Sequence, residues 1–202
     1  MNKRKTIAID IDDTIAGSTE ALRLRVNEKK RVNIPQTGYQ IPGEYWGYYE
    51  RVWTLHGVEA NIDEFHSEMV EDQSHIPLLP GALFAVKTLA EKYDIIFITA
   101  RHNAWEAATR KWFEQNLPSI NHLQLYFTND HTDTLGKTKG QLCVQLGVSL
   151  LIDDNVEHCR SALEENVKAI LYGEYGWHLK MPPQLVRCKD WPSVLEYVNE
   201  KA

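Results

Sequence analysis

An apolar run near the start of the chain ends in a group of side chains that could do chemistry: Asp10, Asp12, Asp13 and Thr14. Residues 6–11 are apolar and β-branched without a helical period, which predicts a buried strand. Side chains alternate along a strand, so Asp10 and Asp12 share one face. So much negative charge at an apolar strand end is unfavourable unless a partner offsets it. The acids therefore either cap a turn or helix, or bind a hard metal ion such as Mg²⁺ through oxygen ligands.

Two later apolar runs also end in polar side chains. The run 93–98 leads into Thr99, Ala100 and Arg101, and the run 148–152 leads into Asp153 and Asp154, with Lys137 and Lys139 between them. A threonine can hold a phosphate oxygen, a lysine can neutralise phosphate charge, and paired acids can complete a Mg²⁺ shell. With a nucleophile and a proton donor from Asp10 and Asp12, these groups suit phosphoryl transfer through an aspartyl phosphate.

Strands and helices alternate along the second part of the chain. We expect strands at 93–98, 122–127, 148–152 and 167–171, and helices at 81–92, 105–116, 139–146, 156–165 and 191–199. This alternation is typical of an α/β fold, a doubly wound parallel sheet with helices on both faces. Such sheets bind ligands at the carboxyl ends of their strands, so the three polar strand ends are expected to converge.

The segment 15–76 has no strong strand signal and is predicted to be a helical insertion. Helices are expected at 20–27, with Ser18 as N-cap, and at 62–70, with Asn61 as N-cap, and a loop is expected at 32–43. The predicted domains are therefore an α/β core, residues 1–14 and 77–202, and an inserted unit, residues 15–76.

Composition limits the classes of partner. The chain has 202 residues, 43% of them hydrophobic, and a net charge of −6. That charge argues against a nucleic-acid polymer or an anionic membrane as the main partner, although a small phosphorylated substrate stays compatible. Three cysteines form neither a disulfide framework nor a zinc spacing. We see no signal peptide and no transmembrane run, and expect a cytoplasmic protein.

These motifs resemble those of the haloacid dehalogenase superfamily of phosphatases. The first motif, Asp-x-Asp-x-Thr, is matched by Asp10, Asp12 and Thr14, the second by Thr99, the third by Lys139 or Lys137, and the fourth by Asp153 and Asp154. All four occur in the family's order across nearly the whole chain. The resemblance implies a Rossmann-like core with a small helical cap inserted after the first strand. Asp13 stands where many members have glycine, although an acid is also common there.

The resemblance also implies roles. Asp10 would attack phosphorus, and Asp12 would protonate the leaving group and then activate water. The cofactor would be Mg²⁺, bound by the Asp10 carboxylate, the Asp12 carbonyl and one of Asp153 and Asp154. Thr99 and a lysine would complete the catalytic set.

The lysine and the substrate contacts leave alternatives open. Lys139 matches the family arrangement better than Lys137, which could instead be surface charge. The candidates for substrate contact in the core are Thr14, Ala100, Arg101 and Lys137. Arg101 either binds substrate phosphate or pairs with a structural acid.

The size of the insertion and the Ile-Asp-Asp ending look most like the 5′(3′)-deoxyribonucleotidases and their bacterial relatives. Cap aromatics stack on the base in those proteins, and here Trp46 and Tyr49, or Trp53, could do so. Alternatively, these rings pack between cap and core. The aromatic segment 172–177 likewise either rims the site or packs. The expected substrate is a nucleoside monophosphate, deoxy or not.

Three other functions compete with this interpretation. A phosphatase for another small phosphoester, such as a sugar phosphate, differs only in the leaving group. A signalling receiver domain also uses an acidic phosphoacceptor, but its acidic pair would come at the first strand rather than late. A non-catalytic phosphate-binding module would not need the second acid, Asp12. The oligomeric state is left open, with a homodimer as one alternative.

Overall fold

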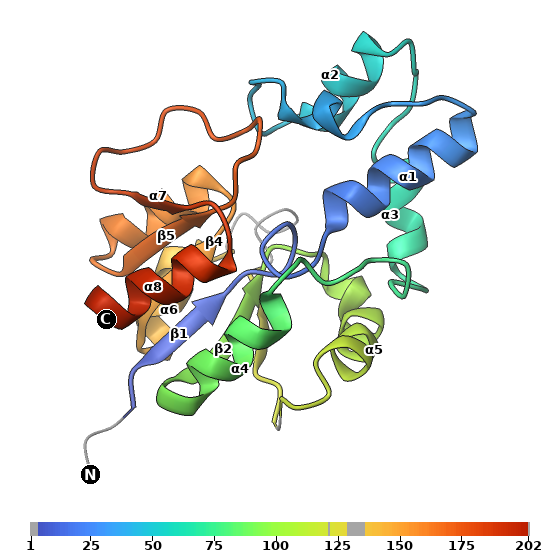
Figure 1. Cartoon of the computed structure of the whole chain (residues 1–202). Coiled ribbons are helices and arrows are strands. Elements are labelled where there is room, and N and C mark those ends of the chain that lie inside the picture. The colour runs from blue at the N-terminus through green and yellow to red at the C-terminus, as the bar shows by residue number, and fades with distance from the viewer. Residues whose placement is uncertain (1–3, 121, 129–135, 202) are drawn as a thin grey trace.

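The computed structural model describes residues 4–120, 122–128 and 136–201. Over these residues the chain forms a sheet of six parallel strands in the order β3-β2-β1-β4-β5-β6 (Figure 1). The strands are β1 (Thr6–Ile9), β2 (Asp94–Thr99), β3 (Leu125–Phe127), β4 (Val148–Asp153), β5 (Lys168–Tyr172) and β6 (Val186–Cys188). The prediction of an α/β, Rossmann-like doubly wound parallel sheet is confirmed, and β1 lies inside it between β2 and β4.

Alternation along the strands decides which helices cover each face. In the described part of the chain, five helices cover the sheet: α4 (Ala82–Lys92), α5 (Glu106–Asn116), α6 (Lys139–Leu146), α7 (Val156–Glu164) and α8 (Trp191–Lys201). Ile7 and Ile9 of β1 belong to one buried cluster, together with residues of α4, α5 and α8. Ala8, between them, belongs to a second cluster with residues of α6 and α7. The apolar runs are continuous because both faces of the sheet are buried.

Two details of the sheet differ from the prediction. Strand β1 ends at Ile9, because the Ile11 carbonyl already accepts hydrogen bonds from the turn that follows, at Ile15 and Ala16. The edge strand β6 (Val186–Cys188) was missed. Three residues, one of them an exposed arginine, are too few to display a period of two.

The segment between β1 and α4 holds helices α1 (Ser18–Lys30), α2 (Tyr48–Leu55) and α3 (Asp63–Met69), which lie beyond the carboxyl end of β1 (Figure 1). They share a third buried cluster, centred on residues such as Val26, Val52, Trp53 and Phe65. The predicted loop 32–43 contains a short 3₁₀ helix, Gln36–Gln40. Ser18 is the first residue of α1 rather than its cap, because its hydroxyl donates to Asp12 instead.

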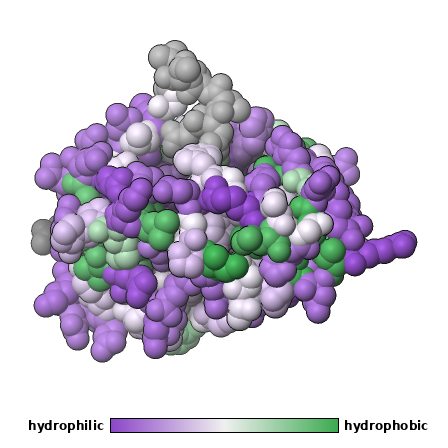
Figure 2. Space-filling view, turned by 90° about the horizontal axis from the view of Figure 1, so that it is seen from above, coloured by the Kyte–Doolittle hydropathy of each residue, from purple (hydrophilic) through white to green (hydrophobic). Residues whose placement is uncertain are grey.

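The surface over this inserted segment is mostly hydrophilic. Figure 2 shows that face with its hydrophobic residues in small separate groups. Among the described residues, no helix combines the length and the apolar character needed to cross a membrane.

Candidate active site

Three acids meet at the carboxyl ends of β1 and β4. These strands pair in parallel with Ile9 opposite Ile152, and the Asp10 amide donates to the Ile152 carbonyl at 2.9 Å. Asp10 therefore lies across from Asp153, and Asp154 follows directly. One carboxylate oxygen from each of the three lies within 4.8 Å of the others, and all three residues are buried. The sheet register alone brings together side chains that are more than a hundred residues apart in the chain.

Lys139 neutralises part of this charge. Its Nζ lies 2.5 Å from Asp10 Oδ1 and 2.6 Å from Asp153 Oδ2, and its side chain is only 1% exposed. Lys139 is the first residue of α6, and Thr138 just before it caps the helix in a capping box with Gln141. The cap fixes the start of the helix and so the direction in which the Lys139 side chain leaves it. Lys137, which precedes α6, is exposed, and its Nζ donates a hydrogen bond to Gln145 of that helix.

Electrostatics favour a divalent cation beside these groups. Burial raises the pKa of Asp10 to about 7, although Lys139 opposes the rise. Burial and the charges of Asp153 and Asp10 hold the pKa of Asp154 well above its ordinary value. Burial also acts to raise the pKa of Asp153, but Lys139 and His158 outweigh it and hold that pKa well below its usual range. The negative charge of three carboxylates exceeds the positive charge of one ammonium, and each carboxylate offers oxygen ligands. This donor set suits Mg²⁺.

These shifts predict that the metal-free protein loses stability as the pH rises from about 4 to about 7. Burial raises the pKa values of Asp10 and Asp13 from 3.8 to about 7, so the folded state keeps protons that the unfolded chain has released. His178 has the opposite sign, because burial lowers its pKa from 6.5 to about 4, but it is one group against two. Urea unfolding with a chelator should show a lower midpoint at about pH 8 than at about pH 5.

Magnesium should reverse this dependence by supplying the missing positive charge. The gain in midpoint on adding Mg²⁺ is therefore expected to be larger at the higher pH, where the acids are ionised. A chelated protein that is more stable at the higher pH would contradict this account of the site.

Asp12 lies beside the cluster in a fork of hydrogen bonds. Arg101 donates to both of its oxygens, through Nε at 2.8 Å and a terminal nitrogen at 2.7 Å, and the Ser18 hydroxyl donates as well. The guanidinium is held from behind by Gln73 at 2.6 Å and Thr109 at 3.1 Å. Burial acts to raise the pKa of Asp12, but Arg101 and Ser18 outweigh it and lower that pKa. Arg101 therefore pairs with an acid in this structure, and its contact with substrate phosphate stays a prediction.

Asp13 links the first strand to the inserted helices. Its backbone is left-handed, with φ of 53°, a conformation that Asp tolerates better than most residues. Its carboxylate accepts hydrogen bonds from the Thr19 amide at 3.0 Å and the Thr19 hydroxyl at 2.5 Å. That hydroxyl lies 2.9 Å from the Tyr49 hydroxyl of α2. The Asp13 carboxylate is therefore hydrogen-bonded to the start of α1.

Thr99, Ala100 and Thr14 lie at the same strand ends. The Thr99 hydroxyl accepts a hydrogen bond from the Arg101 amide at 3.1 Å, and Ala100 lines the cavity described next. Within the described part of the chain, the buried Thr14 hydroxyl has no hydrogen-bond partner.

A cavity of about 540 Å³ lies between these acids and the inserted helices. Its aromatic lining includes Tyr45, Trp46, Tyr48, Tyr49, Phe65 and Trp105, together with His66. Trp46 is 66% exposed. The rings of His66 and Trp105 meet edge to face, with centroids 5.0 Å apart, and join α3 to the core. Trp53 is fully buried and donates to the Tyr39 hydroxyl, so this ring packs inside the inserted helices.

Several solved structures resemble this chain over nearly its whole length. A haloacid dehalogenase-like protein of unknown function from Agrobacterium tumefaciens matches with a TM-score of 0.63 and 12% identity, over 98% of this chain and 99% of that one. The fold is that of the haloacid dehalogenase-like hydrolases. A predicted phosphoglycolate phosphatase from Haemophilus somnus matches with a TM-score of 0.60 and 17% identity, and again 98% and 99% of the two chains are covered.

A third match is the D,D-heptose 1,7-bisphosphate phosphatase from B. bronchiseptica, in complex with magnesium and phosphate. Its TM-score is 0.58 and its identity 13%, over 98% of this chain and 99% of that one. No family model matches the sequence, and no curated protein matches it either. At such low identities the likeness concerns the haloacid dehalogenase-like fold, so the chemistry of this chain rests on its own residues.

Several residues of the site were missed by the sequence analysis. Ser18, Gln73, His158 and Trp177 each contact one of the acids or the arginine beside them. Only Trp177 carried a signal, as part of the aromatic segment 172–177. The others are ordinary polar residues, and their distance from the acids depends on how separate segments of the chain pack together in the folded protein.

Proposed function

We propose that this protein is a Mg²⁺-dependent phosphomonoesterase that works through an aspartyl phosphate. The observation that carries the proposal is the convergence of Asp10, Lys139, Asp153 and Asp154 at one sheet edge, beneath a cavity. A structural ion-pair network would not need an unbalanced set of buried carboxylates that opens onto a cavity. The phosphatases that share the fold raise the expectation further.

In the proposed reaction an Asp10 oxygen attacks phosphorus, and the bond from phosphorus to the ester oxygen breaks. Asp12 donates a proton to that leaving oxygen, then takes a proton from the water that hydrolyses the aspartyl phosphate. Lys139 holds the Asp10 carboxylate in place and offsets phosphoryl charge. Arg101 favours the ionised form of Asp12, so Asp12 must first take up a proton from solvent. A bound substrate that draws the guanidinium away would allow this before the leaving oxygen is protonated.

The residues that would hold Mg²⁺ are the Asp10 carboxylate, the Asp12 carbonyl and, of the late pair, Asp154. Both oxygens of Asp153 already accept hydrogen bonds, one from Lys139 at 2.6 Å and one from the Asn155 amide at 2.9 Å. This favours Asp154 as the direct ligand. When bound, the ion would neutralise phosphoryl oxygens and lower the barrier to attack.

We further propose that residues 15–76 act as a cap and that the substrate is a nucleoside monophosphate. A cavity of about 540 Å³ lies within the range of roughly 300–1,000 Å³ typical of sites for ligands of this size. Its exposed Trp46 offers a face on which a base can stack. A sugar phosphate is the second candidate, because two proteins that share the fold are described as phosphatases of non-aromatic phosphoesters.

A phosphate-release screen over nucleotides and sugar phosphates, with Mg²⁺ and with a chelator, tests the proposal. We expect Mg²⁺-dependent release that is fastest for nucleotides. Faster release from a sugar phosphate would support the phosphatase activity but contradict the nucleotide as its substrate. Tight Mg²⁺-dependent phosphate binding without turnover would instead indicate the non-catalytic module.

Changing Trp46 to alanine should lower kcat/KM for nucleoside monophosphates about tenfold, because stacking on an aromatic ring contributes about 1–3 kcal/mol per base. The value for p-nitrophenyl phosphate should fall much less, since its ring is smaller. Leu55→Ala is a matched control, because Leu55 is also an apolar residue of the inserted segment and is 68% exposed. An equal loss for both substrates in Trp46→Ala would rule out base stacking.

A further inference from the structure

A short segment after β5 reaches back to the acid cluster. The Trp177 indole donates a hydrogen bond from Nε1 to Asp154 Oδ2 at 2.9 Å. The ring is 4% exposed, and Asp154 is 6% exposed. One carboxylate oxygen of Asp154 lies within 4.8 Å of carboxylate oxygens of Asp10 and Asp153. A donor fixed on one of its oxygens therefore restrains the direction in which the carboxylate points.

The indole is held from several sides. Tyr175 stacks on it with ring centroids 4.5 Å apart and an interplanar angle of 3°, and the Tyr175 hydroxyl donates to the Asp13 carbonyl at 2.6 Å. Tyr48 of α2 meets its edge, with ring centroids 5.2 Å apart. Trp177 thus belongs to the buried cluster of the inserted helices while it contacts an acid of the core.

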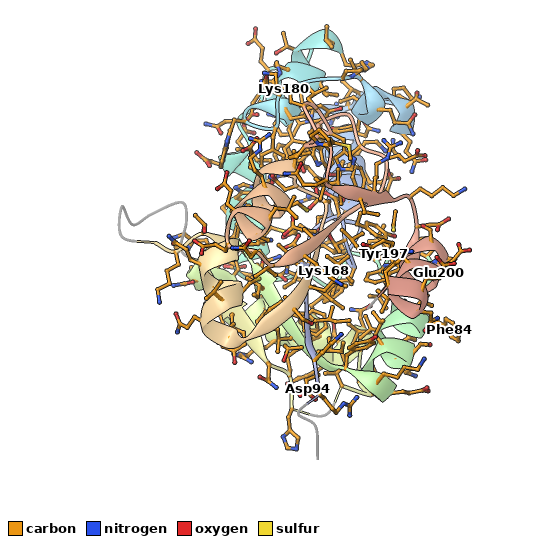
Figure 3. All side chains as sticks on the ribbon, turned by 90° about the vertical axis from the view of Figure 1, so that its left-hand side faces the viewer. Phe84, Asp94, Lys168, Lys180, Tyr197 and Glu200 are labelled. Atoms are coloured by element: carbon orange, nitrogen blue, oxygen red, sulfur yellow. The ribbon has the colours of Figure 1, made fainter. Side chains whose placement is uncertain are left out.

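The segment is packed tightly against the inserted unit. A Cβ at Gly176 would lie 2.1 Å from the Tyr48 hydroxyl and 2.3 Å from the Ile41 carbonyl, so no larger residue fits without movement. The Gly43 amide donates to the Gly176 carbonyl at 3.0 Å. A few residues on, Lys180 lies beside the inserted helices in Figure 3 and pairs with Glu44 at 3.3 Å. The position of the inserted helices therefore bears directly on the position of the indole.

We propose that Trp177 is a positioning residue that aims the Asp154 carboxylate at the divalent cation and so sets the affinity for that cation. This inference rests on the proposed function for the identity of the site, but its test needs no turnover. Outer partners that orient a ligating carboxylate typically change metal affinity by about 10–100-fold when they are removed. Trp177 would also make metal affinity sensitive to the seating of the inserted helices, through Tyr48 and Gly176.

The test is direct Mn²⁺ binding by the full chain without substrate, followed by the electron paramagnetic resonance signal of free Mn²⁺. Trp177→Phe keeps an aromatic ring and removes the N–H donor, and it should raise the Kd for Mn²⁺ about tenfold. Trp53→Phe is the matched control. Trp53 lies in the same buried cluster and also donates an indole hydrogen bond, but its acceptor is the Tyr39 hydroxyl. That variant should bind Mn²⁺ like the wild type.

A second measurement uses the wild-type protein and does not depend on how the variant folds. The indole N–H resonance of Trp177 should shift when Mg²⁺ is added, and that of Trp53 should not. Unchanged Mn²⁺ affinity in Trp177→Phe, equal losses in both variants, or an unmoved Trp177 resonance would each overturn the inference. A wild type that binds Mn²⁺ but hydrolyses no phosphoester would refute the proposed function while this result still stands.

Discussion

Changing Asp10 to asparagine is expected to abolish phosphate release, with a loss on the order of 10⁴-fold or more, because the amide cannot act as the nucleophile. The fold should survive. Asparagine is nearly isosteric with aspartate and removes one charge from a group of acids that repel each other. In the presence of a chelator the urea midpoint at neutral pH should therefore stay the same or rise. Steady-state phosphate release and urea unfolding measure the two effects.

Asp13→Asn is the matched control for this variant. Asp13 is also buried and its pKa is also raised to about 7, but its carboxylate bonds to Thr19 rather than facing Lys139. We expect this variant to retain most of the activity. Near-normal turnover by Asp10→Asn, or an equal loss in both variants, would refute Asp10 as the nucleophile.

Changing Lys139 to methionine should reduce both activity and stability. The ammonium bonds to two buried acids, and removing one partner of a buried ion pair typically costs about 3–5 kcal/mol. We expect a loss of about 3 kcal/mol in the free energy of unfolding at about pH 8 with a chelator, and a smaller loss at about pH 5, where Asp10 can take up a proton. Turnover should fall by about 10²–10³-fold, since a positioned positive group near the phosphoryl oxygens is lost.

Lys137→Met decides between the two lysines. Lys137 is exposed and bonds to Gln145, so its removal should leave the free energy of unfolding within about 0.5 kcal/mol of the wild type. A drop in turnover larger than that of Lys139→Met would assign the catalytic lysine to Lys137 instead.

The pairing of Arg101 with Asp12 gives the site a resting state in which the proposed general acid is ionised. Gln73 holds the guanidinium, and it lies on the segment by which the inserted helices return to the core. Asp12 is therefore tied to that segment by two successive hydrogen bonds. Substrate phosphate offers the arginine another anionic partner, so binding and release of Asp12 can occur in the same step.

The sequence by itself determined the architecture and the chemical inventory. Continuous apolar runs alternating with helical periods required a parallel sheet covered on both faces, and that sheet is what the chain forms. Because parallel strands all end at one edge, the polar residues after β1 and β4 had to lie near each other. Asp10, Asp153 and Asp154 could therefore be grouped before any coordinates were known.

Only the tertiary structure decided which partner each long side chain takes. Lys139 and Lys137 are two residues apart, and a capping box at the start of α6 directs the first of them into the cluster. Trp46 and Trp53 share one aromatic stretch, yet Trp53 on α2 is buried, whereas Trp46, which precedes α2, is exposed. Spacing along the chain sets which face a residue occupies. The contacts of Arg101 with Asp12 and of Trp177 with Asp154 depend instead on separate segments closing to within hydrogen-bond distance, which local sequence does not specify.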